Sequence, residues 1–175
     1  MYLNKRDSRK SRLYRWEYRV LPDVIKKYGK TERHFKFTLA GCKFLIDEAI
    51  TLYNNSWMIP PNVVKGRKNA DATATRVEVS LPEWAHVPAV VLHEVAHTIH
   101  INLMIDNYIS ADQAAHGPEF CRIFAILLSK YYKVPVGKIT KSMRKAGCKV
   151  AGNLDWLQPP NSTTLWKKKQ LTYKA

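Results

Sequence analysis

The clearest hydrophobic pattern along the chain has the period of a helix. From Ala89 to Ile105 there is no proline or glycine, and Pro88 stands where a first helical turn can begin without an N–H group. The apolar positions of this segment have helical spacing, and they are Val91, Leu92, Val95, Ala96, Ile99 and Leu103. The pattern therefore predicts a largely apolar helix over residues 89–105.

Other segments also have helical spacing, with recognisable start and stop signals. Residues 8–28 mix apolar side chains with arginines and lysines; Pro22 is expected to break or kink this helix, and Gly29 to end it. Further helices are predicted over residues 44–53, over the apolar residues from Phe120 to Tyr131, and over residues 135–146, with Gly147 past the end of the last.

Three segments are predicted to be strands. Phe35, Phe37 and Leu39 alternate with polar residues, and Gly41 is expected to turn the chain after them. Pro60-Pro61 forces an extended entry to a short strand near Val63-Val64. The cleanest alternation covers residues 75–81 and ends at Pro82. A few strands among several helices predict an α+β fold.

The apolar helix carries the candidate chemistry. His93 and His97 lie four residues apart, so both imidazoles fall on one helical face and can reach a single metal ion. Glu94 can then lie beside a metal-bound water, where a general base is needed. Two histidines and a glutamate are costly in so apolar a segment unless their polar atoms find partners. The pattern predicts a metal site, with two buried core histidines as the alternative.

Two imidazoles need at least a third protein ligand to hold zinc. His116 is the best candidate, because the polar stretch 106–113 lets the chain fold back and a turn-then-helix signal follows it. Glu119 is the second candidate, with a first-turn acid favoured by the helix dipole as its alternative role. His100 is not expected to bind the metal, because the seven residues after His93 rise about 10.5 Å along the helix.

The motifs His93-Glu94-Val95-Ala96-His97 and His116-Gly117-Pro118-Glu119-Phe120 resemble the core of the SprT-like metalloproteases, which include the Spartan proteases that cleave proteins crosslinked to DNA. The resemblance covers roughly Val87 to Tyr132. It implies that His93, His97 and His116 bind zinc and that Glu94 is the base. In zincin folds a strand such as residues 75–81 forms the sheet edge that holds an extended peptide, so the resemblance also implies substrate binding by main-chain pairing.

A second resemblance extends further along the chain. The opening from Arg6 to Tyr14 is similar to the start of a family of small metallohydrolases from actinobacteria and their phages, whose activity is unassigned. These proteins share both histidine motifs and a segment like Ala146 to Val150. Together the two resemblances imply a zincin-like domain over residues 1–150, with a small mixed sheet packed against the histidine helix. The chain departs from both families after Val150, where the loss of periodicity predicts a basic extended arm over residues 151–175.

Charge is concentrated at the two ends of the chain. The net charge is +15; residues 1–36 carry +8, residues 37–132 carry −2 and residues 133–175 carry +9. Basic flanks around a slightly acidic middle favour contact with a polyanion, and nucleic acid is the leading candidate. In the arm, Trp166 beside Lys167, Lys168 and Lys169 suits base stacking with phosphate contact.

Cysteine and hydropathy patterns place limits on the setting. Cys42, Cys121 and Cys148 form no close pair, which favours buried thiols in a reducing compartment. No apolar run has the length of a membrane span, and the start lacks a signal-peptide core. We therefore expect a cytoplasmic protein, in the host cytoplasm or the virion if a phage encodes it, and ordered basic ends would fit a larger assembly.

Taken together, the patterns predict a hydrolase that uses Zn²⁺ and a Glu94-activated water, most simply a peptidase with a protein or peptide substrate. Tyr108 and His100 are the candidates for stabilising the oxyanion, through proximity in sequence alone. A nucleic-acid-binding or virion structural protein that retains a zinc site is the main alternative. A zinc hydrolase that acts on a non-peptide bond is the second.

Overall fold

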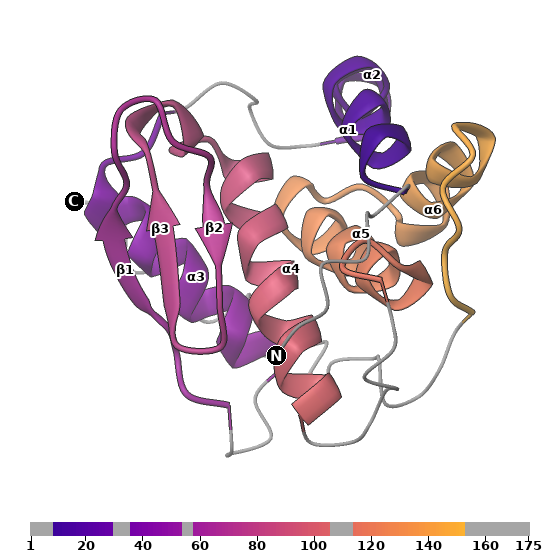
Figure 1. Ribbon diagram of the computed structural model, residues 1–175. Coiled ribbons are helices and arrows are strands. Elements are labelled where there is room, and N and C mark those ends of the chain that lie inside the picture. Colours follow the sequence, from indigo (N-terminus) through magenta and orange to yellow (C-terminus); the bar gives the residue numbers. More distant parts are fainter. Residues whose placement is uncertain (1–8, 30–35, 54–57, 106–113, 153–175) are drawn as a thin grey trace.

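Helix α4 (Pro88–Ile105) lies at the centre of the computed structural model, which describes residues 9–29, 36–53, 58–105 and 114–152. A three-stranded sheet and helix α3 (Leu39–Tyr53) lie on one side of α4 (Figure 1). The other side is covered by α1 (Lys10–Arg19), α2 (Leu21–Tyr28), α5 (Pro118–Tyr132) and α6 (Val136–Lys145). Because α4 is enclosed by both layers, its buried residues surround most of its circumference. The predicted α+β fold is confirmed.

The small sheet is mixed, as predicted. Its strands are β1 (Asn62–Lys65), β2 (Thr73–Ala74) and β3 (Glu78–Leu81), in the order β1-β3-β2. β1 runs parallel to β3, with Val63 opposite Val79, whereas β2 runs antiparallel to it. Val79 and Leu81 are buried and alternate with more exposed residues, because successive side chains of a strand point to opposite faces.

The predicted strand over residues 75–81 is only partly correct. The hydroxyl of Thr75 accepts hydrogen bonds from the backbone N–H groups of Val77 and Glu78, at 3.3 and 3.0 Å. This side-chain turn reverses the chain between β2 and β3, so the regular strand begins at Glu78. β3 is the central strand of the sheet, and β1 and β2 are its two outer strands. The expectation that residues 75–81 form the sheet edge is therefore wrong.

The predicted strand around Phe37 and the turn at Gly41 are also wrong where the structure describes them. Residues 36–38 are not part of the sheet, and α3 already begins at Leu39. The hydroxyl of Thr38 accepts a hydrogen bond from the N–H of Gly41 at 3.1 Å, which satisfies one free amide of the first turn. This cap starts the helix before Phe44, the predicted first residue, and places Gly41 inside it.

The helices at the two ends of the described chain pack together. The N-terminal helix is broken at Val20, and Pro22 lies in the first turn of α2, as predicted. Trp16 of α1 is fully buried; it packs edge-on against Phe124 of α5 and donates a hydrogen bond from Nε1 to the Ser142 hydroxyl of α6 at 3.0 Å. These contacts fix α1 against α5 and α6 (Figure 1).

Helix α6 ends just before Gly147, as predicted. Gly147 has a φ of +83°, a left-handed conformation that glycine adopts without a steric penalty, and the N–H of Cys148 donates to the Met143 carbonyl at 3.0 Å. All three cysteines are buried free thiols. Among the described helices, none combines the length and apolarity needed to cross a bilayer. The predicted arm lies outside the described residues beyond Gly152.

Candidate metal centre

Two histidines of α4 face the same neighbouring helix. His93 and His97 lie one turn apart, with ring centroids separated by 5.0 Å. His93 is buried, whereas His97 is partly exposed, so the pair lies at the border between the core and the solvent. Burial and the neighbouring rings of His93 and His116 hold the pKa of His97 well below its usual range. A neutral imidazole is the form that binds a metal.

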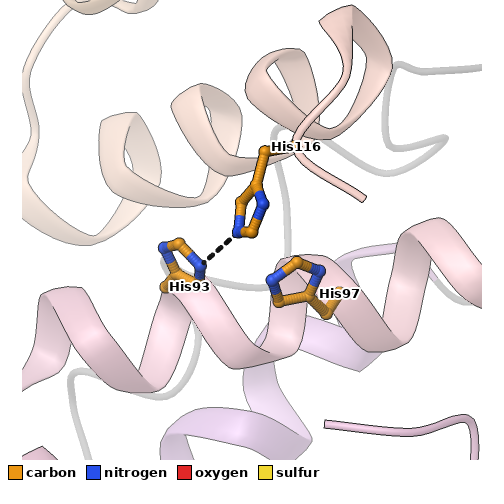
Figure 2. A group of neighbouring side chains, drawn as sticks. All are labelled: His93, His97 and His116. Atoms are coloured by element: carbon orange, nitrogen blue, oxygen red, sulfur yellow. Dashed lines mark hydrogen bonds between the residues drawn. The ribbon is translucent and has the colours of Figure 1, made fainter. Parts of the chain in front are cut away.

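The third histidine, His116, lies in the turn before α5. Gly117 is extended and Pro118 begins the helix, so the chain changes direction immediately after His116. Figure 2 shows the His116 ring pointing into the space between His93 and His97. One nitrogen from each of the three rings lies within 4.8 Å of the others, and the Nε2 atoms of His93 and His116 are 3.2 Å apart. The predicted His93–His97–His116 cluster is therefore confirmed as a group that could hold a metal ion.

The distance between His93 and His116 fits a tetrahedral metal site. Two imidazole nitrogens bound to one zinc ion at about 2.0–2.1 Å, at a tetrahedral angle, lie about 3.3 Å apart. The separation of 3.2 Å between His93 Nε2 and His116 Nε2 is close to this value. The donor set also suits other metals that accept imidazole, so the geometry supports a three-histidine site without fixing the ion.

A carboxylate from α1 orients His93. The Oε2 atom of Glu17 lies 3.1 Å from Nδ1 of His93, and both side chains are buried. A carboxylate only accepts hydrogen bonds, so Nδ1 of His93 donates to Glu17, and in the neutral ring the lone pair of Nε2 faces the other two histidines. Burial lowers the pKa of His93, but the charge and hydrogen bond of Glu17 outweigh this effect and the net pKa is raised.

Two further ionisable groups lie beside the cluster. Glu94 is 6% exposed, and burial raises the pKa of its carboxyl to about 7 against the opposing effect of His93. The ring of Tyr14, from α1, lies 5.5 Å from that of His93 and 5.7 Å from that of His116. Burial, followed by the charges of Glu94 and Glu17, raises the pKa of Tyr14 far above its usual value, so its hydroxyl remains a hydrogen-bond donor.

The other candidates from the sequence fall elsewhere. Among the described residues, the metal-binding group includes neither His100 nor Glu119. His100 is buried next to Phe120, and burial, followed by the charge of His116, lowers its pKa to about 4. Glu119 lies in the first turn of α5, where the helix dipole favours an acid. The candidate for oxyanion stabilisation Tyr108 lies outside the described residues. The same is true of the candidate nucleic-acid-binding residues Trp166, Lys167, Lys168 and Lys169.

The sequence patterns missed Glu17 and Tyr14, which α1 brings to the site from far along the chain. A signal was present for Glu17, because it lies one residue after Trp16 and four after Leu13, on the face of α1 that is buried. An acid on an apolar helical face needs a partner, and His93 provides it. Tyr14 has no such signal, because its partly exposed position resembles that of many surface tyrosines.

Comparisons with models of protein families, with curated proteins and with solved structures found no match.

Proposed function

We propose that this protein is a zinc metallopeptidase of the SprT-like kind. The observation that carries the proposal is the convergence of His93, His97 and His116, with the buried carboxyl of Glu94 directly after the first ligand. A zinc ion held by three imidazoles would lower the pKa of a coordinated water to about 7 and polarise a substrate carbonyl. A purely structural site would need neither a neighbouring base nor a partly exposed ligand such as His97.

In this proposal Glu94 moves the proton. Its carboxylate accepts a proton from the attacking water and passes it to the leaving amine. A general base works best when its pKa lies near the operating pH; burial raises the pKa of Glu94 and would oppose the lowering that a nearby zinc ion causes. Glu17 keeps His93 in the tautomer that points Nε2 at the site.

The sheet edge supports a peptide substrate. β2 is the outer strand on the side of α4, and the Thr98 hydroxyl of α4 donates to the carbonyl of Thr75 at 2.9 Å. This contact ties the end of β2 to the helix that carries two of the histidines. An extended peptide added along β2 would gain main-chain hydrogen bonds. In our proposal the substrate therefore pairs its main chain with the outer strand β2 and not with the central strand β3.

The proposal is tested by incubating zinc-loaded protein with an unfolded protein substrate and a mixed peptide library. We expect new amino termini by mass spectrometry, loss of cleavage with a chelator, and recovery when zinc is restored. Intact peptides together with hydrolysis of an ester or a phosphodiester would contradict the peptidase assignment and support the hydrolase with a non-peptide substrate.

Tyr14→Phe is expected to lower kcat by about 10²–10³-fold with unchanged metal content, because the hydroxyl can donate to a developing oxyanion. Tyr14 contacts the rings of two proposed ligands, and its raised pKa keeps the donor proton in place. Steady-state kinetics and metal analysis check this result. Tyr18→Phe is the matched control, because Tyr18 lies on the same helix and is 67% exposed. Equal kinetics of both variants would remove Tyr14 from the mechanism.

Glu17→Ala is expected to weaken zinc affinity by about 10–100-fold, the usual cost of losing a carboxylate that supports a metal-binding histidine. Glu17→Gln should lose less, because its amide oxygen can still accept from His93 Nδ1. Competition with a chromophoric chelator measures both variants, and Asp23→Ala on the exposed surface of α2 is the control. Unchanged affinity in Glu17→Ala would show that the 3.1 Å contact does not orient the ligand.

We also propose weak, sequence-tolerant nucleic-acid binding, because the basic helices α1 and α2 contact the basic segment around α6. Arg12 of α1 donates to the carbonyl of Gly147 after α6, and the ammonium groups of Lys27 and Lys138 both lie over the Tyr28 ring, at 5.3 and 5.2 Å. Residues 133–152 contain six lysines or arginines and no acid.

Binding to single- or double-stranded DNA is expected at low salt and should fall steeply as salt rises, because each neutralised phosphate releases a counterion. Fluorescence anisotropy over a salt series measures it. Neutralising Lys167, Lys168 and Lys169 should weaken binding without changing zinc content. No binding to either form at low salt would exclude this role and leave an acidic protein partner as the alternative.

A further inference from the structure

A cavity of about 270 Å³ is lined in part by His116, one of the three histidines of the cluster. Arg9 and Arg12 line it from the N-terminal side, and Lys149 lines it from the segment after α6. Two buried residues, Leu13 of α1 and Cys121 of α5, also contribute to its lining. The lining residues thus come from α1, from the start of α5 and from the segment that follows α6.

The lining of this cavity is strongly cationic. Two arginines and one lysine are among the described residues that line it, and none of those described residues is acidic. Glu17, the buried acid of α1, is already hydrogen-bonded to His93. Arg12 and Lys149 line the cavity from two separate segments and add to the charge of a metal at the proposed site, so an anion placed between them is electrostatically favoured.

The size of the cavity limits what that anion can be. Sites for drug-sized ligands usually measure about 300–1,000 Å³, so a cavity of about 270 Å³ fits a group the size of one side chain. Nucleic-acid backbones are bound along extended grooves, whereas this cavity is a single pocket beside His116. A guanidinium such as that of Arg12 matches a carboxylate through two parallel hydrogen bonds.

We propose that this cavity binds a carboxylate of the peptide substrate, next to the bond that is cleaved. The inference rests on the proposed peptidase function and adds a substrate preference to it. The carboxylate belongs either to an aspartate or glutamate side chain, which describes an endopeptidase with acidic specificity, or to the end of the peptide, which describes a carboxypeptidase.

Binding of three small probes to zinc-loaded protein tests the proposal and separates the two sources. N-acetyl-glutamate amide carries only a side-chain carboxylate, N-acetyl-glutamine only a terminal one, and N-acetyl-glutamine amide neither. We expect one of the two acids to bind at least about tenfold more tightly than the neutral amide, a difference of about 1.4 kcal/mol. The perturbed backbone signals in an NMR titration should include those of Cys148 and Lys149.

Two charge-matched double variants show where the probe binds. Arg12→Gln combined with Lys149→Gln should remove the preference for the acid, because both residues line the cavity. Arg15→Gln combined with Lys145→Gln removes the same charge from exposed positions of α1 and α6 and should retain the preference. Equal binding of all three probes, an equal loss in both double variants, or saturation by inorganic phosphate alone would overturn the proposal.

Binding of the probes is measured without turnover of a substrate. Its result can therefore be separated from the result of the peptide-cleavage assay that tests the peptidase function. A protein that binds the acid in this cavity but cleaves no peptide overturns the peptidase function and leaves an anion site. A protein that cleaves acidic and neutral peptides equally, with both double variants as active as the unmodified protein, retains its function and overturns the carboxylate subsite.

Discussion

His116→Ala should empty the proposed metal site. Removal of this side chain leaves the two imidazoles of α4, and two ligands hold zinc poorly. We expect zinc affinity to fall by more than about 100-fold, the upper range for losing only a supporting hydrogen bond. Metal analysis of the purified variant and competition with a chelator measure the loss.

His100→Ala provides the matched control for that experiment. His100 follows His97 on α4 and is buried, yet it lies outside the group of three nitrogens found among the described residues. Its replacement should leave zinc content intact. Stoichiometric zinc in His116→Ala would remove His116 from the ligand set and make Glu119 the candidate third ligand. Zinc loss in His100→Ala that equals the loss in His97→Ala would show that the assigned ligand set is wrong.

Glu94→Gln should retain zinc and fold while kcat falls by about 10²–10⁴-fold, because glutamine cannot accept the proton of the attacking water. The substitution keeps the size of the side chain. Glu94 is only 6% exposed, so the neutral amide takes its place in the same buried position. Thermal unfolding and metal analysis check that the site survives, and single-substrate kinetics measure the loss of activity.

Glu83→Gln is the control for the loss of charge, because Glu83 is exposed in the short helical turn that precedes α4. Its activity should equal that of the unmodified protein. Turnover by Glu94→Gln at the rate of this control would mean that another group accepts the proton. Loss of zinc in Glu94→Gln would mean that the carboxyl supports the ligands rather than the chemistry.

The sequence predicts the helices of this fold better than its strands. The segment 89–105 and the stop at Gly147 follow from apolar spacing and glycine geometry, both of which are local properties. The errors occur where a single threonine hydroxyl redirects the backbone. Thr38 begins a helix within an alternating pattern, and Thr75 turns the chain within another. Period-two spacing does not register such side-chain bonds.

The same division applies to the metal site. His93 and His97 share a helix, and the motif at His116 follows closely in sequence, so their cluster could be predicted from spacing. Glu17, Tyr14 and the cationic cavity depend on how α1 packs against α5 and α6, which no local pattern encodes. The residues that orient and surround the cluster therefore required the three-dimensional structure.

The anchoring of α1 also has a consequence for how the protein matures. Trp16 and its partner Ser142 are 126 residues apart, so the helix that presents Glu17 to His93 is secured by a contact that forms only after α6 has been synthesised. The three proposed ligands all precede α6, so the histidine cluster itself does not wait for that helix. The Glu17 contact that orients His93 is different, because α1 packs on α5 and α6. Full metal affinity would therefore report finished packing of α1, in contrast to small zinc modules, in which the ion itself drives the chain to fold.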